Sequence, residues 1–325
     1  MSNIFGKIKG KAKRIYYDRF IDREKHMFHA YQKRFFQYAF HVDKCNSKMQ
    51  YETIITKYYH AIEKGLAFTD YRAGFGRDNI NTLIRLMEEY SQKYDVNSFC
   101  YKTSLCTLYT YVEKNRKYGL EDTELEKRIN SLPGTANQQG GVLEFAPISD
   151  GQECNYESLV MGRHSIRHFS DIPVDMDILN RALSLAQQTP SACNRQGWGT
   201  IVIQDKNKIS DMLNYQNGNA GFGGEIDVLL LVVAELQAFN CDREVFQPYV
   251  DGGMYAMRLL DSLCYHGIAT CPLSAALTPE QEENVRRIAE INESEIPILF
   301  IGIGNYPETC QTTKSERHNP LTRYV

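Results

Sequence analysis

Several features that identify a protein class are missing from the sequence. It has no continuous apolar stretch as long as a signal peptide or a membrane span, because Lys and Arg interrupt the N-terminal region every few residues. Its nine cysteines are odd in number, irregularly spaced and mostly inside apolar runs, which argues against a disulfide framework and for buried thiols in a reducing compartment. We therefore expect a cytoplasmic protein.

Phosphate-loop and nucleic-acid signatures are missing as well. The short loop Gly74-Phe75-Gly76 lacks the third glycine, the Lys-Ser/Thr pair and the preceding strand of a phosphate loop, so we interpret it as a turn and helix cap. No recognised nucleic-acid module accompanies the basic residues, and no nucleic-acid partner is expected. The net charge of -3 favours no partner by itself.

Charge is nevertheless distributed unevenly along the chain. Residues 1–150 hold 24 Lys and Arg against 18 Asp and Glu, whereas residues 151–325 hold 13 against 22. Residues 1–40 alone carry ten basic and three acidic side chains, interleaved with Ile and Phe. This pattern is typical of a basic amphipathic helix, which either packs on its own domain with a solvated basic face or contacts an anionic membrane surface or a partner protein.

Four residues near this segment have spacings that superficially suit zinc: His26, His29, His41 and Cys45. No second cysteine pair accompanies them, and their helical context is ordinary. No metal site is predicted.

The rest of the front half reads as helices. Apolar periodicity predicts helices over residues 51–66, 79–94, 98–117 and 121–131. His60 and Glu63 lie three residues apart on one face of the first, where they form either an acid/base pair over a substrate or a structural hydrogen-bonded pair. Residues 133–153 are rich in Pro, Gly, Gln and Asn and mark a connection. We therefore expect a helical extension over residues 1–150 and a second domain over residues 151–325.

The second domain combines both kinds of element, which predicts the α+β class. A helix over residues 178–185 stops before Thr189-Pro190, because the residue before a proline is pushed out of helical geometry. Strand-like apolar runs appear at residues 200–203, 227–234 and 296–304. Residues 251–265 form a helix that is apolar on nearly every face and so must be buried in a core or an interface.

Two segments at the start of this domain carry candidate binding residues. Arg163, Ser165 and Arg167 alternate, so in an extended segment all three side chains leave from one side, where they suit a phosphate and an electron-rich ring. The run Pro190-Ser191-Ala192-Cys193-Asn194-Arg195-Gln196 is turn-rich, and its backbone and amide groups can line a polar heterocycle. No nucleophile or metal is needed in either segment.

Together these motifs, R-x-S-x-R-x-F and P-S-x-x-N-x-Q-x-W, resemble the FMN-binding signature of the nitroreductase family. The resemblance implies a nitroreductase-like sheet flanked by helices, preceded here by the helical N-terminal region. It implies that the first Arg and the Ser hold the phosphate and ribityl end, that the second basic residue lies by the N1/O2 edge of the flavin, and that the turn touches the ring. Those roles fall on Arg163, Ser165, Arg167, Pro190, Ser191, Asn194 and Gln196. The family usually has Gln-Pro-Trp where this chain has Gln196-Gly197-Trp198.

Further residues follow from the same resemblance. Asn219 in the loop N-G-N-A-G-F, with Asn217 as a reserve, resembles the family's Asn that reaches the flavin; a plain turn is the alternative. The segment G-I-A-T-C-P-L-S resembles a subgroup pattern associated with polysaccharide gene clusters and with an N-terminal helical extension, and implies flavin contacts from Pro272, Leu273 and Ser274. Cys271 is expected to be a buried thiol rather than a nucleophile. Lys314 and Arg317 correspond to a basic pair against the FMN phosphate.

The implied activity is an FMN-dependent oxidoreduction in which NADH or NADPH reduces the flavin, leaves, and is replaced by an electron-accepting small molecule. The flavin carries the chemistry, so no catalytic side chain is expected. A flavin-binding accessory protein of polysaccharide or envelope biosynthesis, which binds without turnover, is the alternative. The apolar helix of residues 251–265 further predicts a homodimer with the flavins at the subunit interface.

Overall fold

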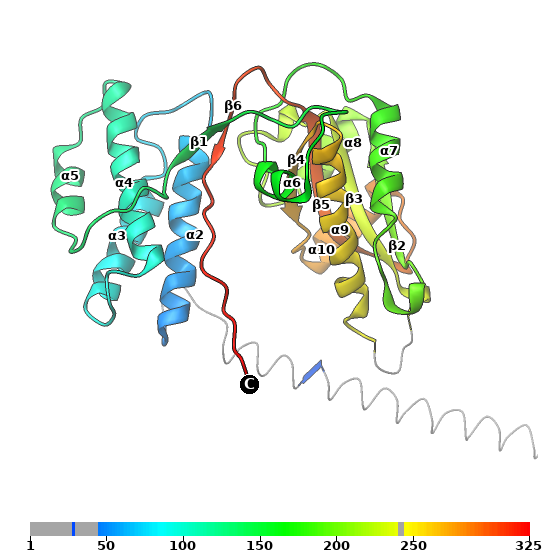
Figure 1. Cartoon of the computed structure of the whole chain (residues 1–325), viewed down its shortest axis with the longest axis horizontal. Coiled ribbons are helices and arrows are strands. Elements are labelled where there is room, and N and C mark those ends of the chain that lie inside the picture. Colours follow the sequence, from blue (N-terminus) through cyan, green and yellow to red (C-terminus); the bar gives the residue numbers. More distant parts are fainter. Residues whose placement is uncertain (1–27, 30–44, 240–243) are drawn as a thin grey trace, which may run out of the picture.

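A computed structural model describes residues 28–29, 45–239 and 244–325 (Figure 1). The expected basic helix of residues 1–40 therefore lies almost wholly outside the described residues, as do His26 and His41. Within the described parts of the chain, no helix is both long and apolar enough to cross a membrane.

The front of the described chain is a group of four helices, as expected. They are α2 (Lys48–Leu66), α3 (Arg77–Ser91), α4 (Phe99–Lys117) and α5 (Thr123–Asn130). The hydroxyl of Ser47 accepts a hydrogen bond from the Gln50 amide to start α2, and Asp122 caps α5 in the same way at Leu125. Gly76, in the left-handed region with φ 66°, starts α3, so the glycine loop is a helix cap. One apolar core, built only from these helices and their loops, holds the group together.

The back of the chain is a four-stranded antiparallel sheet with helices on both faces, which confirms the α+β class. Its strands, in the order β2-β3-β5-β4, are β2 (Trp198–Ile203), β3 (Val228–Glu235), β5 (Glu295–Asn305) and β4 (Ile268–Ser274). Its helices are α6 (Tyr156–Gly162), α7 (Met176–Ala186), α8 (Lys206–Leu213), α9 (Gln247–Tyr265) and α10 (Pro279–Ala289). Short 3-10 turns η1 (Ala192–Asn194), η2 (Gly223–Glu225) and η3 (Leu236–Ala238) complete it.

Strand β3 shows why this sheet needs two helical layers. Every residue from Val228 to Ala234 is buried, and alternate side chains belong to different cores. Leu229, Leu231 and Val233 face the core shared with α8 and α10, whereas Val228, Leu230 and Val232 face the core shared with α7 and α9. The three strand-like runs in the sequence thus correspond to β2, β3 and β5; β4 was expected only as a segment over the flavin.

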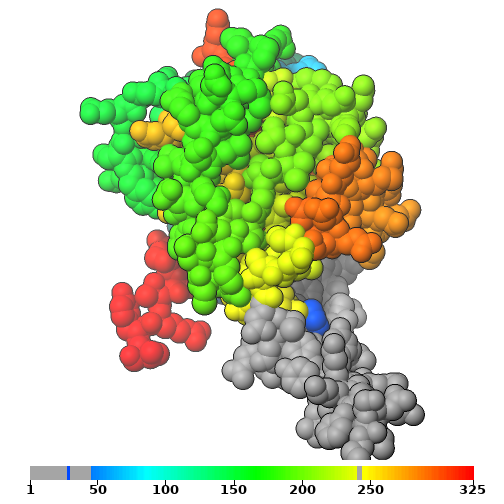
Figure 2. All heavy atoms as spheres, turned by 90° about the vertical axis from the view of Figure 1, so that its right-hand side faces the viewer, coloured from blue at the N-terminus to red at the C-terminus, as the bar shows by residue number. Residues whose placement is uncertain are grey.

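A two-stranded ribbon joins the two groups of elements. β1 (Val142–Phe145) lies inside the expected connection of residues 133–153 and pairs antiparallel with β6 (Cys310–Thr313). Figure 1 shows this ribbon crossing between the helical group and the sheet. After β6 the chain returns to the helical group, where the rings of Phe99 and His318 lie 4.3 Å apart. The last residues then stand away from the body, as the red spheres in Figure 2 show.

Candidate functional site

The alternating segment Arg163, Ser165 and Arg167 runs along the outer strand β4. Ser165 forms a parallel bridge with Thr270, and the Ile166 amide donates to the Thr270 carbonyl at 2.8 Å. Thr312, in β6, donates its hydroxyl to the Ser165 carbonyl at 2.8 Å. The segment is therefore held on both sides through its own main-chain atoms, which leaves its side chains available to a ligand.

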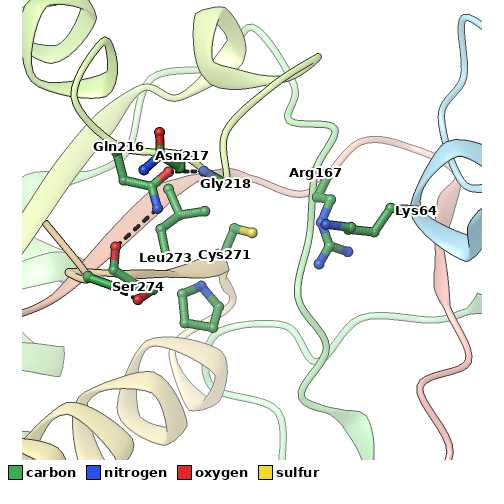
Figure 3. Close-up of a pocket in the computed structure, with 10 residues that line it drawn as sticks. Lys64, Arg167, Gln216, Asn217, Gly218, Cys271, Leu273 and Ser274 are labelled. Carbon is green, nitrogen blue, oxygen red and sulfur yellow. Dashed lines mark hydrogen bonds between the residues drawn. The ribbon is translucent and has the colours of Figure 1, made fainter. Parts of the chain in front are cut away.

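Arg167 and the predicted residues Pro272, Leu273 and Ser274 line one cavity of about 300 Å³. Its other walls come from Lys64 in α2, from Cys271 and Ala276, and from residues 216–218 (Figure 3). The volume is at the lower end of the range for small-molecule sites. The structure thus brings together one part of the predicted set, the second arginine and the segment at the end of β4.

Arg163 lies nearby in a different setting. One of its guanidinium nitrogens, Nη1, is buried without a hydrogen-bond partner. A buried donor without a partner costs free energy, so such an atom in a native protein calls for a ligand or other explanation. Burial raises the pKa of the Cys271 thiol. The positive charges of Arg167, Lys64 and Arg163 act in the opposite direction but are the smaller effect. Cys271 is thus a neutral buried thiol and no activated nucleophile.

The turn formed by residues 190–196 is not part of this cavity. It leads through Gly197 into β2, and β2 and β4 are the two edge strands of the sheet. Three inter-strand spacings separate those two strands, which is about 14 Å. The two predicted halves of the site, which the sequence motifs suggest as one, are therefore not adjacent within a single chain.

The same turn is strained and firmly held. Cys193, Asn194 and Gln196 all have positive φ, which non-glycine residues rarely adopt. Buried Asp251 accepts from the Ala192 amide at 3.0 Å, and Arg195 makes a bidentate pair with Glu244, with both distances 2.8 Å. Backbone strain that its surroundings hold in place is common at binding sites.

Steric crowding explains why position 197 is glycine, where the family usually has proline. A Cβ atom at this position would lie 2.6 Å from the Cβ of Ala238, closer than real contacts allow. Any side chain, proline included, would force η3 away from the turn. Trp198 is meanwhile anchored by a hydrogen bond from Nε1 to the Gln187 side chain at 3.0 Å and by stacking on Tyr255.

Asn219 is engaged in its own loop. Its amide nitrogen donates to the carbonyls of Leu213 and Gln216, at 2.8 and 2.6 Å. Asn217, the reserve candidate, lines the cavity instead. The plain-turn interpretation therefore describes the position of Asn219 in this structure.

The two basic residues after β6 are placed differently from each other. The Lys314 ammonium donates to the Gln138 carbonyl at 2.7 Å, so it fastens the chain's tail to the connection before β1. Arg317 is exposed and donates to the Ser315 carbonyl. The pKa of His164 is lowered mainly by burial, next by the charge of Arg163 and then by the charge of Arg317. Arg317 thus lies within electrostatic range of the Arg163 segment.

His60 and Glu63 form the structural pair. Their side chains are 3.3 Å apart, and the fully buried Glu63 carboxylate also accepts from the Gly141 amide at 3.0 Å. This contact fixes α2 to the start of β1. Neither residue lines the cavity.

Lys64 is the charged residue of the cavity that sequence reasoning missed. It lies on α2, about a hundred positions before Arg167, so nothing in the linear order relates the two. Figure 3 shows its side chain ending beside that of Arg167.

Comparison with known proteins supports the resemblance. Residues 160–220 match the model of the nitroreductase family. A protein named as an NAD(P)H nitroreductase from Streptococcus pyogenes is 46% identical over 44 residues, which are 14% of this chain and 22% of that protein. This curated relative is thus matched over about a fifth of its own length.

Two solved structures also match about half of this chain. One, named as an NAD(P)H:FMN oxidoreductase from Staphylococcus epidermidis, is 14% identical, with 55% of this chain and all of that chain covered and a TM-score of 0.48. The other, an FMN-dependent nitroreductase from Clostridium difficile, is 19% identical, with 47% and 88% covered and a TM-score of 0.42. The family resemblance predicted from the motifs is confirmed by the family match over residues 160–220, a segment that contains Arg163, Arg167 and the turn before β2.

Proposed function

We propose that this protein is an FMN-dependent oxidoreductase that takes electrons from NADH or NADPH and passes them to a small electron-accepting molecule. The observation that carries the proposal is the Arg163 segment beside β4. It lies in the part of the chain that matches the nitroreductase family, its Arg167 opens on a cavity, and its Arg163 has a buried nitrogen without a partner. A bound phosphate would supply the missing acceptor.

The residues present fit such a cofactor. FMN would supply the hydride and electron chemistry when bound, and the protein's part is to bind and orient it. Arg163, Ser165 and Arg317 would hold the anionic end, and Arg167 would place a positive charge by the ring, which favours its reduced form. Main-chain groups of Pro272, Leu273 and Ser274 would line one side of the site.

A homodimer would complete the site. The turn of residues 190–196 and the Arg163 segment lie at opposite edges of the sheet. A second subunit would therefore be needed to bring one subunit's turn to the other's arginines. Helix α9 offers a surface for this. Its exposed apolar residues are Tyr249, Val250, Met254, Met257 and Tyr265. The neighbouring α6 adds Tyr156, Val160 and Met161. An apolar surface of this extent is typical of an interface.

The structure changes which residue tests the dimer. Among the apolar residues of α9, Leu260 is buried within its own subunit, whereas Met257 is 46% exposed. We expect Met257→Asp to fold, to become monomeric and to lose flavin. Met49→Asp, an equally exposed methionine at the start of α2, is the matched control. A wild-type protein that is monomeric by light scattering while it retains flavin would contradict the dimer.

The main test is the visible spectrum of the purified full-length protein. We expect flavin absorbance, identified as FMN after release, that bleaches on anaerobic addition of NADH or NADPH and returns when an electron acceptor is added. Such alternating half-reactions would also support the ping-pong order. Bound flavin that stays oxidised would support the accessory protein, and a protein that neither contains nor takes up FMN would refute the proposal.

A further inference from the structure

Two cations share the cavity, and they come from different parts of the chain. Lys64 is on α2 of the helical group, and Arg167 is on the segment beside β4. Figure 3 shows the ammonium of one close to the guanidinium of the other, across the cavity from Leu273 and Ser274. The helical group thus contributes a charged side chain to a site whose other walls belong to the sheet.

Neither cation is neutralised by a described side chain. The described residues that line the cavity include no Asp or Glu, and no ion pair joins Lys64 or Arg167 to another described residue. Glu63 is next to Lys64 in the sequence but is used by His60 and the Gly141 amide. Arg167 makes one long hydrogen bond, 3.4 Å, to the Ser165 carbonyl.

The Gln216 side chain on the opposite wall is already paired. The Gln216 side chain donates to the Ser274 carbonyl at 3.0 Å and accepts from the Gly218 amide at 2.6 Å. The two cations are the charged groups that line this cavity, and neither forms an ion pair with a described residue. A ligand that enters it would gain most by offering an acceptor to them.

Holding two like charges together in a partly buried place is unfavourable. Burial, and then the charge of Arg167, lower the pKa of Lys64. An anion between the two groups would offset both effects, because a negative charge favours the charged form of each cation. The arrangement is thus that of a binding site for a negative charge.

We propose that Lys64 and Arg167 together bind an anionic group, a carboxylate or a phosphate ester, of the electron-accepting substrate. This rests on the proposed oxidoreductase function and names the substrate class of the same site. A guanidinium has five N–H donors, so Arg167 can serve both the flavin and the substrate. The helical group then selects the substrate, although the cofactor lies with the sheet.

The test compares 4-nitrobenzoate with 4-nitrobenzamide, which have a similar shape but differ in charge. With saturating NADH or NADPH, KM is measured for each acceptor on wild-type holoprotein and on Lys64→Met, Lys64→Arg and Lys57→Met. Lys57 is an exposed lysine on the same helix and serves as the matched control. Calorimetric binding of both compounds to the oxidised holoprotein gives a readout independent of turnover.

We expect wild type to prefer the carboxylate, and Lys64→Met to lower that preference by about tenfold, as the loss of one charge-assisted hydrogen bond predicts. Lys64→Arg should restore it, and Lys57→Met should leave it in place. An unchanged preference in Lys64→Met, or an equal loss in Lys57→Met, would overturn the inference while leaving flavin reduction intact. A loss of flavin affinity in Lys64→Met without a change in acceptor preference would assign Lys64 to the flavin instead. Failure of the flavin to bleach in wild type would refute the function itself.

Discussion

The helical group and the sheet unit bury their side chains in different ways. The helical group has one core that includes the buried tyrosines Tyr51, Tyr59, Tyr71, Tyr90, Tyr101 and Tyr111. Several of their hydroxyls are hydrogen-bonded inside the group, such as Tyr71 to Asn115 at 2.7 Å and Tyr111 to the Phe75 carbonyl at 2.8 Å. The sheet unit has two mainly aliphatic cores, one on each face of β3.

This difference indicates a division of labour. Aliphatic cores on both faces make the sheet a rigid support, and its predicted binding residues lie at its outer strands rather than in its interior. The paired hydroxyls, such as those of Tyr71 and Tyr111, favour one arrangement of the helices, because each must meet its partner. The helical group therefore holds α2, and with it Lys64, in a defined position against the site.

The largest expected effect is in the sheet unit. Leu260 is 6% exposed and belongs to the α7–α9 core, so Leu260→Asp would bury an unpaired charge there. We expect a loss of more than about 4 kcal/mol in the free energy of unfolding, and little soluble protein. Expression and thermal denaturation measure this. A soluble Leu260→Asp protein with wild-type melting would contradict the assigned core.

The second effect concerns a buried tyrosine of the helical group. Burial raises the pKa of Tyr101 to about 12, from an ordinary value of 10.0. The folded state therefore favours the neutral phenol, and this stability is fully present below pH 10 and is lost as the pH rises through 12. The loss of free energy of unfolding from this residue is about 3 kcal/mol. We expect phenolate absorbance to rise together with loss of helical circular dichroism. Tyr101→Phe should move that transition to higher pH; an unmoved transition would contradict the prediction.

The third effect sharpens the assignment of the cofactor to the sheet unit. Arg163→Ala or Arg167→Ala should weaken FMN retention by about 1.5–3 kcal/mol, the value of a charge-assisted hydrogen bond. Arg72→Ala, an exposed arginine of the helical group, is the control. Flavin occupancy after dialysis measures the effect. Unchanged occupancy in both sheet-unit variants would remove the site assignment.

The smallest effect concerns the contact between α2 and β1. Glu63→Gln keeps the shape of the side chain but removes the charge that Gly141 and His60 contact, so we expect a loss of about 1–3 kcal/mol. Glu113→Gln, at an exposed position of α4, should change stability by less than about 0.5 kcal/mol. Chemical denaturation measures both. Equal losses of unfolding free energy in the two variants would show that the buried contact contributes no more to stability than the exposed position.

Local patterns predicted the elements better than their assembly. The four front helices and the strands β2, β3 and β5 follow from apolar periodicity, because those segments bury a continuous face or a whole strand. β1 and β6 could not be found, since each has four residues and owes its conformation to a partner about 170 positions away. β4 was not predicted as a strand because it contains Cys271-Pro272. Proline has no N–H to donate to a neighbouring strand, so this pair is typical of a loop.

The candidate site was predictable only where the motif is local. Arg163, Ser165 and Arg167 share a short segment, so the alternation predicts that they lie close together; in the structure Arg167 lines the cavity and Arg163 does not. Lys64 enters the cavity through packing between distant elements, which no short pattern encodes. The separation of residues 190–196 from the arginines depends on the strand order, which the sequence did not reveal.

The ribbon of β1 and β6 has a consequence for folding. Because it joins residues 142–145 to 310–313, the whole sheet unit is a closed loop between the two strands of the ribbon. The contacts of α2 to α5 are local in sequence and can form early, whereas the ribbon needs its two distant strands to meet and pays the entropy of closing a long loop. The ribbon should therefore form last, and with it the contacts that the C-terminal tail makes to the helical group.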